Sequence, residues 1–213
     1  MKKTALFAAL LGMTSIAGTA QADKLDDIIS SGTLRCAVVL DFPPMGMRDA
    51  NNVPIGFDVD YCNDLAAALG VEAEIVETPF PERIPALMSG RVDVGVASTS
   101  DTLERAKTVG FSIPYFAFEM AVTANSGTGI TSYEGMKGHT VGAVAGTKDI
   151  TVVGFAPFDT DYVALFAKRD EYGFLNYLDL FVNQQVRTGR YDELYEKWVG
   201  GEVPKLMVPN AHR

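Results

Sequence analysis

Strand-like and helix-like stretches alternate near the start of the chain, and this alternation constrains the fold more than any other feature. The strand-like stretches are residues 33–40, 71–77 and 91–98, and the helix-like stretches between them are residues 58–70 and 82–90. The first strand is apolar nearly throughout, which is typical of a strand covered on both faces, and the last also looks buried. Strands that are joined by helix-length crossovers run parallel. We therefore predict an α/β fold with a parallel sheet.

The first 22 residues have the three parts of a secretory signal peptide. Lys2 and Lys3 come first, an apolar run follows, and Ala20–Ala22 supplies the small residues of a cleavage site. The apolar run is too short and too badly flanked for a transmembrane anchor. We therefore predict that residues 1–22 are removed and that a soluble chain is exported to the periplasm. The alternative is a buried N-terminal helix.

Charge and cysteine usage narrow the function classes. The chain has 18 basic and 27 acidic residues and a formal net charge of −9 at pH 7, which disfavours nucleic acid as a partner.

Cys36 lies in a predicted strand and Cys62 in the predicted helix that follows it. Export would allow a disulfide between them, and two buried thiols are the alternative. The two histidines, His139 and His212, are too few for a Cys/His metal site, and we expect neither metal nor cofactor.

Hydroxyl groups and one arginine follow the third strand, in the segment ASTSDTLERAK, Ala97–Lys107. The DTLE tetrapeptide fits a capping box, which predicts that a helix begins at Asp101. Arg105 would then lie near the positive end of that helix, where a cation is disfavoured unless an anion is bound. Ligands bind at the carboxyl ends of parallel strands. We therefore interpret Ser98, Ser100 and Arg105 as a carboxylate clamp; an arginine that points into solvent is the alternative.

Several motifs together resemble the amino-acid-binding branch of the periplasmic solute-binding proteins of ABC importers. They are GTLRCAVVLDFPPMGM, GFDVDYCNDLAAALG, ERIPALMSGRVDVGVASTSDTLERAKTVGFSIPY, GHTVGAVAGT and RTGRYDELYEKWVGG. The combination of GFDVD with SGRVDV, ERA and FSIPY carries the resemblance. It implies a periplasmic-binding-protein-like fold, in which two α/β lobes with parallel sheets are joined by two crossover strands and close on one ligand. A subset of the family also has a cysteine pair.

The resemblance also implies which residues hold the ligand. The predicted ligand-binding residues are Phe42, Phe80, Ser98, Ser100, Arg105, Gly146 and Thr147. Arg105 and Ser100 would bind the α-carboxylate of an amino acid, and Ser98 would offer its carbonyl to the α-ammonium. The two phenylalanines would stack on the ligand side chain. Gly146 and Thr147 would donate N–H groups from the second lobe. The ordinary alternatives are a hydrophobic staple for Phe80 and a plain turn for Gly146.

The second lobe looks shorter than the family pattern. We predict lobe 1 at residues 23–111 and 163–213 and lobe 2 at residues 112–162, with the first hinge in SIPYF. In the family a helix, a strand, a further helix and a further strand follow the turn at Gly146. Here TKDI runs almost at once into the return segment, so the lobe lacks more than one βαβ unit of roughly 30 residues. Asp159 and Asp161 are nearby acids, but no pattern makes either of them the ammonium partner.

Three explanations fit the short second lobe: a deletion, a genuinely reduced lobe, or a lobe completed by exchange of segments with a second copy in a dimer. The leading functional hypothesis is a receptor, not an enzyme, that captures a free amino acid and delivers it to an ABC permease in the inner membrane. The first alternative is an enzyme on the same fold, such as a cyclohexadienyl or arogenate dehydratase, which would need a general acid over the ligand. The second is a ligand-sensing subunit.

Overall fold

A five-stranded sheet organises the part of the chain that the computed structural model describes, residues 23–119, 121–139, 150–155, 160–201 and 203. Its strand order is β4-β1-β5-β9-β6. The strands are β1 (Thr33–Val38), β4 (Glu72–Glu77), β5 (Val94–Ser100), β6 (Val109–Phe118) and β9 (Asp161–Lys168). β1 pairs in parallel with β4 and β5, which confirms the predicted parallel sheet. β9 brings the chain back into the sheet and runs antiparallel to both β5 and β6. The predicted signal peptide lies outside the described residues.

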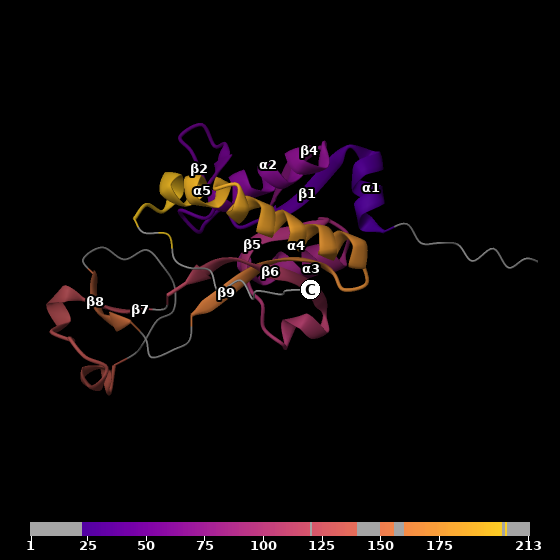
Figure 1. Cartoon of the computed structure of the whole chain (residues 1–213). Helices are drawn as coiled ribbons and strands as arrows, with labels where there is room; N and C mark the ends of the chain where they lie inside the picture. The colour runs from indigo at the N-terminus through magenta and orange to yellow at the C-terminus, as the bar shows by residue number, and fades with distance from the viewer. Residues whose placement is uncertain (1–22, 120, 140–149, 156–159, 202, 204–213) are drawn as a thin grey trace, which may run out of the picture.

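Helices cover both faces of this sheet, as the apolar strands predict (Figure 1). One face packs against α1 (Lys24–Ser31), α2 (Phe57–Leu69), α4 (Tyr172–Arg187) and α5 (Arg190–Trp198), and the other against α3 (Arg83–Met88). Side chains alternate along β1, so that Cys36 faces α2 whereas Ala37 faces α3. Gly95 on β5 lies opposite Phe166 on β9, whose ring fills the space that a side chain at position 95 would need.

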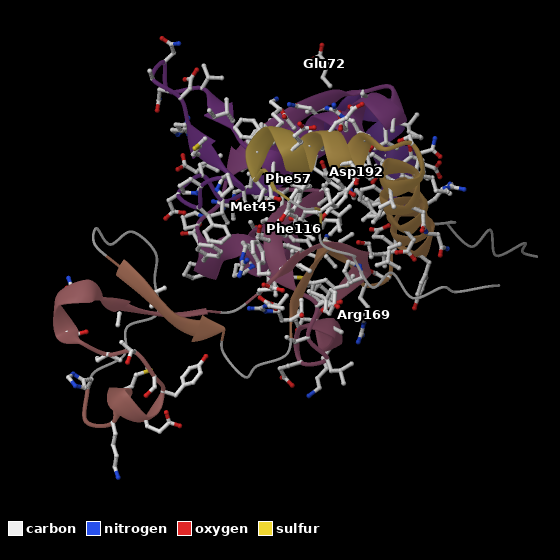
Figure 2. The ribbon with its side chains drawn as sticks, turned by 60° about the vertical axis from the view of Figure 1, so that its left-hand side comes forward. Met45, Phe57, Glu72, Phe116, Arg169 and Asp192 are labelled. Atoms are coloured by element: carbon white, nitrogen blue, oxygen red, sulfur yellow. A yellow bond between two sulfur atoms is a disulfide. The ribbon has the colours of Figure 1, made fainter. Side chains whose placement is uncertain are left out.

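Aromatic rings fill the core between the sheet and α2, α4 and α5. Phe57 stacks on Tyr61 at 5.8 Å and meets Phe116 edge-on at 5.2 Å. Phe57 and Phe116 lie inside this body, whereas Glu72 projects from its surface (Figure 2). The disulfide of Cys36 with Cys62 joins β1 to α2, and its Cα atoms are 6.4 Å apart. The sequence had left two free thiols as the alternative, and the structure decides for the disulfide.

A separate two-stranded sheet is formed by part of the described chain between β6 and β9. It pairs β7 (Ala121–Asn125) with β8 (Ile150–Phe155) in antiparallel fashion, and it stands away from the larger body on β6 and β9 (Figure 1). Two 3₁₀ turns follow β7, at Ser126–Thr128 and Glu134–Met136. A small hairpin of β2 (Met47–Arg48) and β3 (Pro54–Ile55) lies in the first loop. The lobe boundaries stay predictions.

The helix expected to begin at Asp101 is absent. β5 continues to Ser100, and the N–H of Asp101 donates to the Tyr162 carbonyl at 3.2 Å, so that pairing with β9 extends past the strand end. β6 begins at Val109, and the chain between the strands has room for only one turn. That turn is a 3₁₀ helix, Arg105–Lys107. The argument that a helix macrodipole explains Arg105 is therefore wrong.

Candidate ligand-binding site

Ser98 is the buried centre of a hydrogen-bond network at the carboxyl end of β5. Its backbone has a φ of 45°, a left-handed conformation that costs a non-glycine residue about 1–3 kcal/mol. Its hydroxyl donates to Asp58 Oδ2 at 3.0 Å, and its N–H donates to the Tyr115 hydroxyl at 3.0 Å. The Tyr115 hydroxyl donates to Asp58 Oδ1 at 2.7 Å. These three bonds hold Ser98 in its strained conformation and fix how β5 ends.

The sequence prediction missed Asp58 and Tyr115. Asp58 lies in GFDVD on α2 and Tyr115 in SIPYF on β6, and both side chains are almost wholly buried. Burial raises the pKa of Asp58 to about 7, although the hydrogen bonds from Tyr115 and Ser98 act to lower it. Burial, and then the neighbouring Asp58, raise the pKa of Tyr115 well above its ordinary value. Asp58 begins a sequence that predicts a helix, and nothing local in GFDVD marks its side chain as buried.

Arg83, also missed, is a buried cation beside Ser98. Its Nη1 donates to the carbonyls of Ala97 at 2.8 Å and Ser98 at 2.9 Å, and its Nε donates to the Phe80 carbonyl at 3.0 Å. The guanidinium lies over the Phe80 ring, 4.7 Å from its centroid. Burial, and then the positive charge of Arg105, lower the pKa of Arg83 to about 10, so it stays a cation at neutral pH. The Ser98 carbonyl, predicted to meet the ligand ammonium, therefore already accepts from a cation.

Arg105 and Asp161 are both joined to Ser100, the last residue of β5. The Arg105 Nη1 donates to the Ser100 carbonyl at 3.0 Å. The Ser100 hydroxyl donates to Asp161 Oδ2 at 3.2 Å. Arg105 is half-buried, and no carboxylate of the described residues lies within 4.0 Å of its guanidinium. Within the described part of the chain, this bond uses one of the five N–H donors of the guanidinium, which leaves donors for an anion.

The two predicted aromatic residues meet each other. Phe42 contacts Phe80 edge-on, with ring centroids 5.3 Å apart, and it contacts Phe118 on β6 at 5.8 Å. Phe80 is 38% exposed, whereas Phe42 and Phe118 are half-buried. Phe80 also meets Arg83, which bonds to Ser98. Contacts through Arg83 thus link Phe42 and Phe80 to Ser98, and Ser100, two residues further along β5, bonds to Arg105. Gly146 and Thr147 lie outside the described residues.

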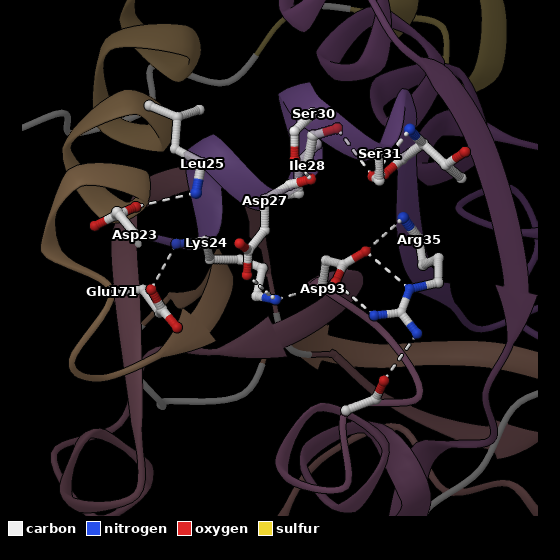
Figure 3. A network of polar contacts seen from close by, with 12 residues as sticks. Asp23, Lys24, Leu25, Asp27, Ile28, Ser30, Ser31, Arg35, Asp93 and Glu171 are labelled. Atoms are coloured by element: carbon white, nitrogen blue, oxygen red, sulfur yellow. Dashed lines mark hydrogen bonds and ion pairs between the residues drawn. The ribbon is translucent and has the colours of Figure 1, made fainter. Parts of the chain in front are cut away.

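A cavity of about 340 Å³ lies elsewhere, where β1 and β4 begin. It is lined by Lys24, Arg35 and Asp93 among others. Figure 3 shows why these charges are not a vacant anion site. Arg35 forms a two-pronged pair with Asp93, with Nη2–Oδ1 at 2.7 Å and Nε–Oδ2 at 3.0 Å, and also donates to the Gly90 carbonyl. Ligands of parallel α/β sheets bind at the other, carboxyl end, where Ser98 and Arg105 lie.

The model of a protein family, the bacterial extracellular solute-binding proteins of family 3, matches residues 34–201 of this chain. The chain belongs to this family. Its fold is accordingly the periplasmic-binding-protein-like α/β fold. No helix within the described residues is both long and apolar enough to cross a membrane.

Two curated relatives carry names of different functions. A cyclohexadienyl dehydratase of Pseudomonas aeruginosa is 37% identical over 107 residues, which is 50% of this chain and 39% of that protein. The arginine-binding extracellular protein ArtP of Bacillus subtilis is 34% identical over 107 residues, 50% of this chain and 42% of that protein. A third relative, a putative ABC transporter arginine-binding protein of Escherichia coli, is covered to 56%. The chain thus spans from about two fifths to just over half of these relatives.

Solved structures agree with the fold. The arginine-bound form of domain 1 from TmArgBP has a TM-score of 0.53 at 26% identity, and the likeness covers 75% of this chain and 98% of that one. An ABC uptake transporter substrate binding protein from Streptococcus pneumoniae with bound histidine has a TM-score of 0.77, with 86% and 98% covered. At 18% identity this second likeness shows the fold alone.

Proposed function

We propose that this family-3 protein is an extracytoplasmic receptor that captures a free amino acid, whose α-carboxylate binds to Arg105. The observation that carries the proposal is the state of that guanidinium. It is half-buried at the carboxyl end of β5, and among the described residues it bonds to the Ser100 carbonyl rather than to a carboxylate. An arginine fork fits a carboxylate with two parallel hydrogen bonds. Phe42 and Phe80 would flank the ligand side chain, as the resemblance to the family implies.

The shortened second lobe that the sequence predicts is compatible with this role. The residues that would hold the ligand lie on β5, on the turn after it and in the loops of the larger body. A solved relative is described as the arginine-bound form of a single domain, domain 1 from TmArgBP. We therefore propose that lobe 1, residues 23–111 and 163–213, carries most of the binding free energy. Lobe 2, residues 112–162 with Gly146 and Thr147, would add to it on closure.

Delivery to an ABC permease of the inner membrane, and residence in the periplasm, are part of the same proposal. They are supported by relatives named as ABC transporter arginine-binding proteins and as the lysine/arginine/ornithine-binding periplasmic protein, all of Escherichia coli. Exchange of segments with a second copy stays a prediction, which the oligomeric state of the purified protein would test.

Calorimetry on the purified full chain tests the receptor. Twenty amino acids would be screened, and Arg105→Ala would be compared with Arg187→Ala, which removes an exposed arginine that bonds only within α4. Loss of a charge-assisted bond pair of about 2–3 kcal/mol predicts that Arg105→Ala weakens binding about 30- to 140-fold, with Arg187→Ala unchanged. If the wild type and Arg105→Ala bind the amino acid with equal affinity, the proposed carboxylate clamp is refuted.

A dehydratase is the second candidate, because the relative from Pseudomonas aeruginosa carries that name. Asp58 is the described acid whose pKa, about 7, would suit a general acid. However, its side chain is almost wholly buried and both oxygens accept hydrogen bonds from Ser98 and Tyr115. Incubation with arogenate and prephenate distinguishes the two candidates, since product formation identifies an enzyme and binding without turnover identifies a receptor.

A further inference from the structure

A buried polar cluster lies behind the end of β5, next to the proposed binding site. It draws one residue each from α2, α3, β5 and β6, and its members are Asp58, Arg83, Ser98 and Tyr115. All four residues are at most 9% exposed. Asp58 bonds directly to Ser98, which lies two residues before the one whose carbonyl accepts from Arg105. The cluster therefore connects a buried carboxyl group with the end of the strand where we propose that an amino acid binds.

The hydrogen bonds of this cluster are arranged for an ionised Asp58. The Ser98 hydroxyl donates to Oδ2 and the Tyr115 hydroxyl to Oδ1, at 3.0 and 2.7 Å. The Tyr115 oxygen also accepts from the Ser98 N–H, so this hydroxyl group has no further hydrogen to give. A proton added to Asp58 therefore fits on Oδ2, where it would donate to the Ser98 hydroxyl oxygen. The hydrogen of the Ser98 hydroxyl would then be released for another acceptor.

The charges around Asp58 make its proton sensitive to an anion at the end of β5. Burial raises the pKa of Asp58 to about 7, and the positive charge of Arg83 acts to lower it. Arg105 acts in turn on Arg83, whose pKa it lowers. Tyr115 on β6 and Tyr61 on α2 also interact with Asp58, and both have a pKa well above the ordinary value, so they stay neutral at pH 7. An anion near the cluster disfavours a second negative charge on Asp58.

We propose that Asp58 is a positioning residue of the binding site that takes up one proton from solvent when the carboxylate of an amino acid binds to Arg105. The inference rests on the proposed amino-acid receptor and adds a dependence of affinity on pH. The incoming proton would lie between Asp58 and Ser98, and the Ser98 hydroxyl hydrogen would turn toward the ligand carboxylate. Because the bound state holds this proton more tightly than the free state, affinity should fall as the pH rises through about 7.

Calorimetry at several pH values measures the proposed coupling. The full chain would be titrated, from about pH 5.5 to about pH 8, with the L-amino acid other than histidine that binds it best in the screen of twenty. Titration near pH 7.5 in phosphate and in Tris, whose ionisation enthalpies differ, gives the number of protons taken up. Asp58→Asn removes the titrating group. Asp26→Asn, which removes an exposed acid of α1, is the matched control with the same change of net charge.

We expect the affinity of the wild type to fall about 3- to 10-fold across this range, with uptake of about half a proton near pH 7.5. Asp26→Asn should behave in the same way. Asp58→Asn should bind without proton uptake and with an affinity that changes less than about twofold with pH. A flat wild-type profile, or proton uptake that persists in Asp58→Asn, would overturn the inference and leave the receptor standing. A wild type that binds no amino acid would overturn both proposals.

Tyr115→Phe tests the same coupling if Asp58→Asn fails to fold or to bind. It removes the hydroxyl group that donates to Asp58 Oδ1, and this bond favours the ionised carboxyl group. The pKa of Asp58 should therefore rise, so that the affinity falls at a higher pH than in the wild type. If the cluster only supports the strand, Tyr115→Phe will change the affinity by the same factor at every pH, and that result would overturn the inference.

Discussion

Asp58 makes the stability of the fold depend on pH in an unusual direction. Its carboxyl group is almost wholly buried, and burial raises its pKa from 3.8 to about 7. Unfolding exposes the group to water, where it ionises near pH 4. Between about pH 4 and pH 7 the folded chain therefore holds a proton that the unfolded chain has released. The free energy of unfolding contributed by Asp58 falls as the pH rises through this window.

The size of the effect follows from the width of the window. The contribution changes by about 1.4 kcal/mol per pH unit over about three pH units, which gives a loss on the order of 4 kcal/mol. The loss is complete above about pH 7, and it is absent below about pH 4. A domain is typically stable by about 5–15 kcal/mol, so the change is easily measured. Other acids add their own pH dependence, so the difference between two variants is the quantity to measure.

Asp58→Asn removes the titrating group and keeps an oxygen that can accept from Tyr115. Urea unfolding at pH 4 to 8 would compare the wild type, Asp58→Asn and Asp26→Asn, whose acid is exposed on α1. We expect the wild type to lose about 4 kcal/mol relative to Asp58→Asn across this range. Asp26→Asn should follow the wild type. If the free energy of unfolding of the wild type does not fall relative to that of Asp58→Asn as the pH rises, the burial argument is refuted.

Two further changes test the disulfide and the charged cavity. The double variant Cys36→Ala with Cys62→Ala should lose about 3.5 kcal/mol of unfolding free energy, measured in urea, because the bond closes a loop between residues 26 apart. Unchanged stability would show that the unfolded chain gains no freedom without the bond. Asp93→Asn, which removes the charge facing Arg35, should lower stability by about 2–3 kcal/mol and leave amino-acid affinity within about twofold. Loss of binding in a folded Asp93→Asn variant would place the ligand in the cavity beside Arg35.

The sheet could be predicted because its signals are local and repeated. Apolar strands, helix-length connections and terminal glycines over residues 33–98 indicate parallel strands covered on both faces, and β1, β4 and β5 have that pairing. The turn after β5 could not be predicted, because the DTLE sequence occurs in loops as well as at the start of helices. The nearby start of β6 and the pairing of Asp101 with Tyr162 decided against a helix there. Tertiary pairing thus overrode a local propensity.

The site could be predicted in part, for a related reason. Ser100 and Arg105 are five residues apart on one segment, so the sequence places them together. Asp58, Arg83 and Tyr115 reach Ser98 from α2, α3 and β6, and no spacing along the chain reports such a meeting. Asp161 meets Ser100 only because β9 returns beside β5. Long-range pairing assembles the polar half of the site.

For the amino-acid receptor that we propose, the strand end offers a rigid binding surface that does not depend on closure of a second lobe. Between β6 and β9 the described residues form one two-stranded sheet, and such a sheet is marginally stable by itself. Ser98, in contrast, donates hydrogen bonds to two buried side chains, Asp58 and Tyr115, which are bonded to each other, and Arg83 donates to its carbonyl. Ser100, which bonds to Arg105 and Asp161, follows two residues later on the same strand. A clamp held this firmly before the ligand arrives loses little conformational entropy on binding, which offsets contacts that a smaller lobe would not supply.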